Sequence, residues 1–217
     1  MVLYSGWRAA KWWTIVTIAL CAATVLSNTI YLPSGGTPRF LLEKGWLAHQ
    51  AWWRTAFYFH VVGASICLIA GIPLMFAGFA RWSPQWHRRL GYLYINAVLW
   101  MAAPAGLAMA MFAKGGLFGA LGFTLAGCLW WRSTWAGYRE IRAGDLPAHI
   151  RSMVRSYAWA LSAPAFRAIQ MGFYYVGLAD EPNYVVSLWL SIAASVWLSE
   201  SFVRRRQPRA ALVVLTS

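Results

Sequence analysis

The hydrophobic positions of this chain fall in six long runs that are separated by short polar segments. Each run holds about twenty predominantly apolar residues, the length that carries an α-helix across a hydrocarbon core of roughly 30 Å. Because the bilayer interior offers the backbone no hydrogen-bond partner, each run is predicted to be helical. The expected spans are 12–32, 55–79, 90–111, 117–138, 153–177 and 184–203. The pattern predicts an all-α, polytopic transmembrane helix bundle that forms one domain over residues 1–217.

The segments that flank the first run allow two further predictions. Arg8 and Lys11 precede this run, as in a signal peptide, but its apolar core exceeds the usual length of about 7 to 15 residues. We therefore expect a retained first helix rather than a cleaved leader. Residues 40–54 mix apolar and charged side chains, a pattern typical of a helix that lies in the outer interface of the membrane.

Composition and charge agree with a membrane protein. Apolar residues make up 60% of the chain and charged residues 12%, whereas a typical soluble domain carries about 25% charged residues. With both termini inside, thirteen Lys and Arg residues lie on the cytoplasmic side and four on the opposite side. The positive-inside rule favours this orientation. We expect a multi-pass protein of a bacterial inner membrane, whose positive charge contacts anionic phospholipid head groups and not nucleic acid.

Cysteines and prolines inside the runs add structural expectations. The three cysteines have no metal-ligand spacing and are predicted to be buried apolar fillers; they are Cys21, Cys67 and Cys128. A proline within a span frees the carbonyl four residues earlier, which must find another partner; the candidates are Pro73, Pro104 and Pro164.

A histidine stands beside a stripe of small residues in the second span. His60 shares one helix face with Gly63, Ala64, Cys67, Gly71, Leu74 and Gly78,. One interpretation is close helix packing, because small residues let backbones approach. The other is a flat or ring-shaped ligand against the glycines, with His60 as its axial or hydrogen-bonding partner. An ionisable residue at this depth is a functional candidate.

Arg167 lies deepest among the charged residues of the fifth span. It is too far from either interface to reach water easily, and no acid of the sequence lies at its predicted depth. A backbone carbonyl, an aromatic face, water, or an anionic or carbonyl group of a ligand are the candidate partners. Because His60 and Arg167 lie at similar depth, they are candidates for one shared site. Arg132, in contrast, lies close enough to the inner end of the fourth span to snorkel.

Two further histidines mark the cytoplasmic rim. His87 and Arg88 precede the third span, and His149 and Arg155 flank the start of the fifth. These residues are predicted to cradle a phosphate or a haem propionate, or to ligate a metal through His87 and His149. The simpler alternative is that both histidines contact lipid phosphate.

These elements resemble a bacterial family known only as predicted membrane proteins with a domain of unknown function. The resemblance covers about residues 55 to 175. It rests on His60, on the His-Arg-x-x-Gly-x-x-Tyr element at His87, on Met-x-Arg-Ser-Tyr-Ala after His149, and on Arg167. Ile150 and Ser152 depart from the pattern of the family, which has Arg and an aromatic residue there. The resemblance implies a membrane protein and no particular reaction.

Two functional hypotheses follow from the residues. The first is a membrane redox protein that binds b-type haem or a quinone through His60, Arg167, His87 and His149. The second is a non-enzymatic binding, accessory or transport protein that holds an anionic or lipidic ligand in a cavity between the helices. The sequence contains neither a nucleophile elbow nor a His-Glu-x-x-His motif, so no motif points to a hydrolase,.

Overall fold

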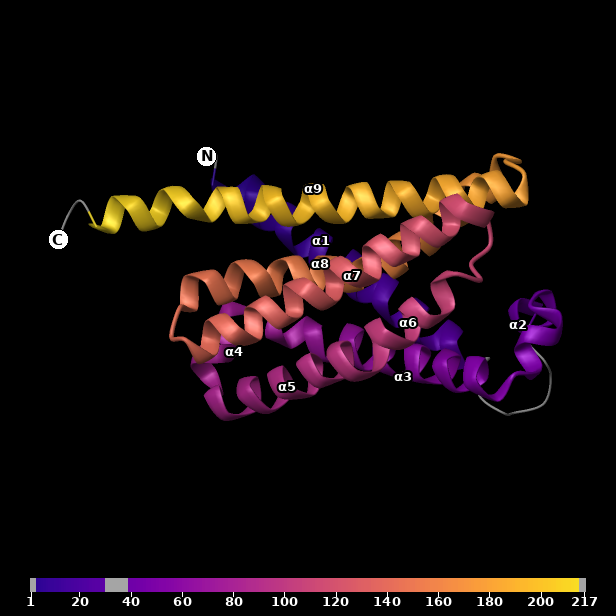
Figure 1. Ribbon diagram of the computed structural model, residues 1–217. Coiled ribbons are helices and arrows are strands. Elements are labelled where there is room, and N and C mark those ends of the chain that lie inside the picture. The colour runs from indigo at the N-terminus through magenta and orange to yellow at the C-terminus, as the bar shows by residue number, and fades with distance from the viewer. Residues whose placement is uncertain (1–2, 30–38, 215–217) are drawn as a thin grey trace.

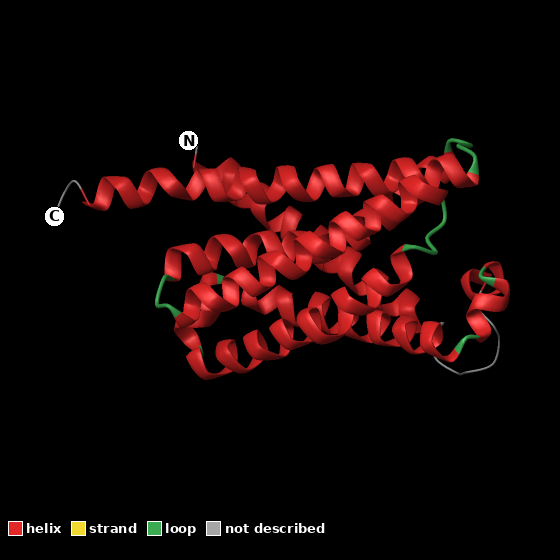
Figure 2. Ribbon diagram, in the orientation of Figure 1, coloured by secondary structure: helices red, strands yellow, loops and turns green. Residues whose placement is uncertain are grey.

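The computed structural model describes residues 3–29 and 39–214, with the side chains of 14–29, 40–76 and 78–204. Within these ranges every regular element is helical (Figure 2). The elements are α1 (Leu3–Asn28), α2 (Arg39–Glu43), the 3₁₀ helix η2 (Gly45–His49), α3 (Ala51–Leu74), α4 (Ala77–Trp82), α5 (Pro84–Asn96), the π-helix η3 (Ala97–Ala102), α6 (Ala103–Ala110), α7 (Gly116–Arg142), α8 (Leu146–Tyr175) and α9 (Asp180–Val214). The predicted all-α class is confirmed.

The long helices form a bundle in which sequence neighbours lie side by side (Figure 1). The elements α5, η3 and α6 follow one another without a break and act as one long helix. The first helix crosses the bundle obliquely and packs against α3 and α8 (Figure 1). Both ends of the chain lie at the same end of the bundle, on the left of Figure 1, together with the α7–α8 turn.

Three helices of the described chain are long and apolar enough to cross a membrane. They are Ala51–Leu74, Pro84–Ala110 and Asp180–Arg204. Among the other long helices, α7 and α8 carry Trp, Ser and Arg residues within their length, which lower their average hydropathy.

The helix bounds differ from the predicted spans around α3. Residues 51–54 belong to α3, so the predicted interfacial segment 40–54 is shorter in the structure and consists of α2 and η2. The predicted span 55–79 ends early, because the helix stops at Leu74, next to Pro73, and α4 begins separately at Ala77. A proline near the end of a helix removes one hydrogen bond of its last turns.

A turn of three residues, Ala143 to Asp145, joins α7 to α8. Gly144, with φ at +82°, follows the last turn of α7, and Gly144 N and Asp145 N donate to Ile141 O and Glu140 O. This is the Schellman arrangement, which favours glycine because its φ is positive. Asp145 then caps α8 by accepting a hydrogen bond from Ala148 N at 2.9 Å,. The turn fixes α7 and α8 as an antiparallel pair.

Small polar residues let α9 approach the bundle closely. Its buried face carries a residue of this kind at every fourth position: Asn183, Ser187, Ser191, Ser195 and Ser199. The four serine hydroxyls donate to groups of α9 itself, so they need no partner across the interface. Small side chains with internally satisfied hydroxyls are typical of close packing between membrane helices.

The cysteines divide between the core and the surface. Cys21 and Cys67 are buried, as expected, with 2% and 0% of their surface exposed. Cys128 is exposed on α7, so the prediction that all three are buried was wrong for this residue. An apolar run does not show which of its positions face outward, because lipid accepts the same side chains as the core.

Candidate functional site

His60 is held against the middle of the third long helix. Its Nδ1 lies 2.7 Å from the carbonyl oxygen of Ala102, the last residue of η3. The ring packs on Gly106, where an added Cβ would lie 2.8 Å from Nδ1. The glycine therefore makes room for the imidazole. A carbonyl can only accept, so Nδ1 carries the proton and Nε2 keeps its lone pair.

The carbonyl that receives His60 belongs to a stretch whose hydrogen bonding is shifted by one residue. In η3 the N–H of Ala103 donates to Val98 O, five residues earlier. In this register the N–H at position 104 would serve Leu99 O, but Pro104 has none. The indole Nε1 of Trp131 takes that place at 3.3 Å. Short π-helical stretches occur frequently at functional sites.

The stripe of small residues beside His60 packs against protein. A Cβ at Gly63 would lie 2.8 Å from Met101 Cβ, and one at Gly71 would lie 2.0 Å from the ring of Tyr157. Cys67 Sγ lies 3.9 Å from Tyr94 O. These contacts fill the space in which a flat ligand would lie, and they favour the packing interpretation of the stripe.

Arg167 reaches across to the last turn of α1. Nη1 donates to Thr24 O at 3.1 Å and to Ser27 Oγ at 3.0 Å, and Nη2 donates to Asn28 Oδ1 at 2.9 Å. A guanidinium is favoured here because the C-terminal end of a helix carries negative partial charge. The side chain is close enough to His60 to act on it electrostatically. Thr24 O is one of the partners expected from sequence, whereas Ser27 and Asn28 were missed.

His149 repeats the arrangement of His60 at the other end of the bundle. It lies in the first turn of α8, and its Nδ1 lies 2.7 Å from Gly137 O on α7. Gly137 also lets α7 and α8 approach closely, since a Cβ there would lie 2.7 Å from Met153 Sδ. Once more a main-chain carbonyl places the proton on Nδ1 and leaves the lone pair on Nε2.

His87 lies near His149 and has no comparable anchor. The two imidazoles lie within electrostatic range of each other, and the ring of His87 stands 6.1 Å from that of Phe79. Its Nδ1 is buried and has no hydrogen-bond partner in the part of the chain that the structure describes. The two rim histidines therefore influence each other electrostatically, whereas His60 lies on α3.

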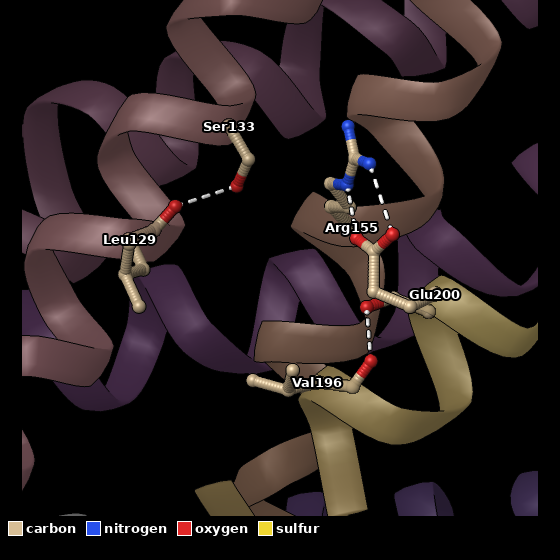
Figure 3. A network of polar contacts seen from close by, with 6 residues as sticks. Leu129, Ser133, Arg155, Val196 and Glu200 are labelled. Atoms are coloured by element: carbon tan, nitrogen blue, oxygen red, sulfur yellow. Dashed lines mark hydrogen bonds and ion pairs between the residues drawn. The ribbon is translucent and has the colours of Figure 1, made fainter. Parts of the chain in front are cut away.

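The two rim arginines differ in their freedom to bind a ligand. Arg155 donates from Nε to Glu200 Oε1 at 2.6 Å and from Nη2 to Oε2 at 3.2 Å, which joins α8 to α9 (Figure 3). Arg88 is exposed. Glu140 acts electrostatically on Arg155. Arg155 is therefore largely engaged by Glu200, whereas Arg88, the other predicted anion contact, is exposed.

A buried hydroxyl network in the centre of the bundle was not predicted. Tyr94 OH lies 2.9 Å from Ser156 Oγ, which lies 2.6 Å from Thr134 Oγ1, and Trp130 Nε1 donates to Tyr94 OH at 3.4 Å. All four side chains are buried. The network joins α5, α7 and α8 between the two histidine positions. Tyr94 and Ser156 do belong to the two sequence elements that carry the resemblance.

The described residues contain no cluster of side chains that could hold a metal ion by themselves. No three His, Cys, Asp or Glu side chains gather closely enough there to hold one. The metal-ligand candidates His60, His87 and His149 do not form one group. An iron porphyrin differs, because it needs only one or two protein ligands.

Comparison with known protein families identifies the family of this chain. The model of the family described as "Predicted membrane protein (DUF2306)" matches residues 57–203. The chain belongs to this family. The matched DUF2306 region runs from α3 to α9, and it includes His60, His87, His149 and Arg167. No curated protein and no solved structure matches the chain. The protein is therefore a DUF2306 membrane protein, and its activity has to be argued from its residues.

Proposed function

We propose that this protein is a membrane-embedded redox protein that binds b-type haem. The observation that carries the proposal is the shared geometry of His60 and His149, each with Nδ1 at 2.7 Å from a carbonyl of a neighbouring helix. Iron-ligating histidines usually donate their other ring N–H to such a group, which fixes the tautomer and the ring orientation. Both imidazoles present Nε2 as the remaining donor atom.

The rim pair fits the ligand set of a haem better than His60 does. His87 and His149 lie within electrostatic range of each other, on the first turns of two different helices. The buried Nδ1 of His87 lacks a protein partner in the described chain, so this ring is the less constrained of the two. His149 and His87 are the residues that would ligate the haem iron, and the exposed Arg88 would supply positive charge for a propionate,. Haem supplies an iron that accepts and releases one electron.

His60 has a different place in this proposal. It lies on α3, and it belongs to no group of three or more His, Cys, Asp or Glu side chains among the described residues. With the proton on Nδ1, Nε2 accepts a hydrogen bond, for example from the hydroxyl of a reduced quinone. Arg167, near enough to act electrostatically, favours a neutral or electron-rich group there.

The test is an absorption spectrum of detergent-purified protein from haem-supplemented cells, air-oxidised and then reduced with dithionite. We expect a Soret band that sharpens on reduction in the wild type. We expect His149→Ala and His87→Ala to lose it, and His60→Ala to keep it. His49→Ala is the matched control, because His49 is exposed on η2. A spectrum without haem bands at full haem supply, from protein that is helical by circular dichroism, contradicts the proposal.

The competing proposal is a non-enzymatic accessory protein in which the histidines are structural. One observation favours it: each histidine bond joins two helices, α3 to η3 and α7 to α8. In that case the wild type shows no haem bands, and His60→Ala and His149→Ala lower the melting temperature while His49→Ala does not. The same set of variants thus separates the two functions.

A further inference from the structure

The inner half of α7 presents three arginines on one outward face. Arg132 and Arg139 are seven residues apart, two helical turns, and therefore lie above one another, with Arg142 three residues further,. All three side chains are exposed. No ion pair of any of them is recorded among the described residues. The adjacent acid Glu140 acts on Arg155 instead.

Aromatic rings line the same face. Trp131 stacks on Trp135 with centroids 5.8 Å apart and planes at 21°, and Trp135 lies 5.8 Å from Tyr138. The indole of Trp131 is fixed by its bond to Leu99 O. Exposed fractions of 37% and 39% leave Trp131 and Trp135 open to the surroundings. Indole rings favour the head-group level of a membrane, where the ring is in apolar surroundings and the N–H meets polar groups.

The depth of Arg132 restricts what binds this face. Arg132 precedes the end of α7 by ten residues, about 15 Å at 1.5 Å per residue, and exposed Leu125 and Cys128 lie just beyond it. A soluble acidic protein does not reach a cation beneath the head groups. A phospholipid phosphate does, because the arginine extends toward it along the helix.

We propose that these residues, Arg132, Trp135, Tyr138, Arg139 and Arg142, form a binding surface for an anionic phospholipid. The arginines hold the phosphate, and the indole N–H of Trp135 donates to an ester carbonyl. A net negative head group is preferred over a zwitterionic one, because the surface carries three cations and no acid. The surface, here named the α7 basic face, is separate from the histidines and does not depend on haem binding.

The test compares short-chain phosphatidylglycerol with phosphatidylcholine, each titrated into the detergent-purified full chain. We expect the wild type to bind phosphatidylglycerol more tightly. We expect Arg132→Gln combined with Arg139→Gln to weaken that binding about 30-fold, because each basic residue near an anionic surface contributes roughly a factor of five. The matched control is Arg81→Gln combined with Arg89→Gln, which removes two exposed arginines at the same end of the bundle.

A folding measurement and a second pair of variants serve as controls for this titration. Circular dichroism shows that the variants are folded, and the charge-preserving pair Arg132→Lys and Arg139→Lys is expected to regain most of the affinity. Equal affinity of the wild type for both lipids overturns the proposal. An equal loss in the Arg81 and Arg89 control also overturns it, because the effect then belongs to total charge and not to the α7 basic face.

Discussion

Asn28 is the residue on which two hydrogen bonds from other helices converge. Its Oδ1 accepts from Arg167 Nη2 at 2.9 Å, and its Nδ2 donates to Ser65 Oγ at 3.0 Å. The amide supplies both an acceptor and a donor, which a carboxylate of the same size does not. Asn28 thereby joins α1 to α8 and to α3 at one point.

We expect Asn28→Ala to lower the free energy of unfolding by about 1 to 3 kcal/mol, because it leaves one hydrogen bond of the Arg167 guanidinium and one of the half-buried Ser65 hydroxyl unmade,. Thermal or denaturant unfolding in detergent micelles measures the change. Ser27→Ala is the control, since Ser27 is exposed and gives Arg167 a single contact. A loss for Ser27→Ala equal to that for Asn28→Ala contradicts this role.

Gly71 shows how closely α3 and α8 approach. A Cβ at this position would lie 2.0 Å from a ring atom of Tyr157, and that ring is itself held by a bond from its hydroxyl to Leu68 O at 3.3 Å. The glycine is therefore required by the aromatic side chain opposite, not by its own backbone angles.

We expect Gly71→Ala to destabilise the protein by about 1 to 3 kcal/mol through overpacking. Gly172→Ala is the matched control, because Gly172 lies inside α8 with nothing within 4 Å of an added Cβ. Alanine is favoured over glycine within a helix by roughly 0.5 to 1 kcal/mol, so this control is expected to be neutral or stabilising. Melting temperatures that fall equally in both variants are inconsistent with the packing explanation.

At the level of elements, the π-helix η3 receives hydrogen bonds from two neighbouring helices. His60 of α3 reaches Ala102 O and Trp131 of α7 reaches Leu99 O. The sequence indicated that Pro104 frees a carbonyl, and it placed that carbonyl four residues earlier, at Trp100. The π-helical register moves it to Leu99. Such a shift depends on packing against α3 and α7, which hydropathy does not report.

Trp131→Phe is expected to cost about 1 to 3 kcal/mol, because Leu99 O is left buried without its donor. In a Pro104→Ala background the same substitution is expected to cost less, because the new N–H at position 104 can serve that carbonyl. A double-mutant cycle on unfolding free energies measures the coupling. If the changes in unfolding free energy caused by Trp131→Phe and Pro104→Ala simply add, Trp131 does not replace the missing N–H of Pro104.

The sequence could reveal the ionisable side chains of the candidate site but not the groups that they contact. His60 and Arg167 stood out because ionisable residues are rare in apolar runs, and His149 stood out because it precedes a span beside basic residues. Their partners did not, because Ala102 and Gly137 contribute main-chain carbonyls that any residue supplies. Hydroxyls such as Ser156 are common in membrane helices, and only the fold shows that Tyr94 and Thr134 meet them.

For the whole molecule, hydrophobic periodicity was enough to predict the class and the long helices. The lengths of the runs give the helices, while the places where helices end depend on local chemistry, as at Pro73 and Gly144. The direction in which each helix faces was not predictable, since lipid and core accept the same side chains, as Cys128 shows.

The position of both termini at one end of the bundle makes a prediction for the intact membrane. We expect a green fluorescent protein fused after Ser217 to be fluorescent and an alkaline phosphatase at the same point to be inactive, since the positive-inside rule predicts that this end is cytoplasmic. The same fusions after Phe112, in the α6–α7 connection at the opposite end, are expected to give the reverse result. Equal phosphatase activity at both points would falsify the orientation.

The hydrogen bonds between Arg167 and the last turn of α1 also have a consequence for how the protein is inserted into the membrane. More than a hundred residues separate Thr24 from Arg167, so α1 is synthesised long before α8. Inserting an arginine at the centre of a helix costs about 2.5 to 3.5 kcal/mol on the translocon scale, and the acceptors at the end of α1 offset that cost only if α1 is still nearby. The first helix is thus expected to remain beside the translocation channel until α8 is inserted. It would act there as an intramolecular chaperone, because its acceptors lower the cost of inserting Arg167.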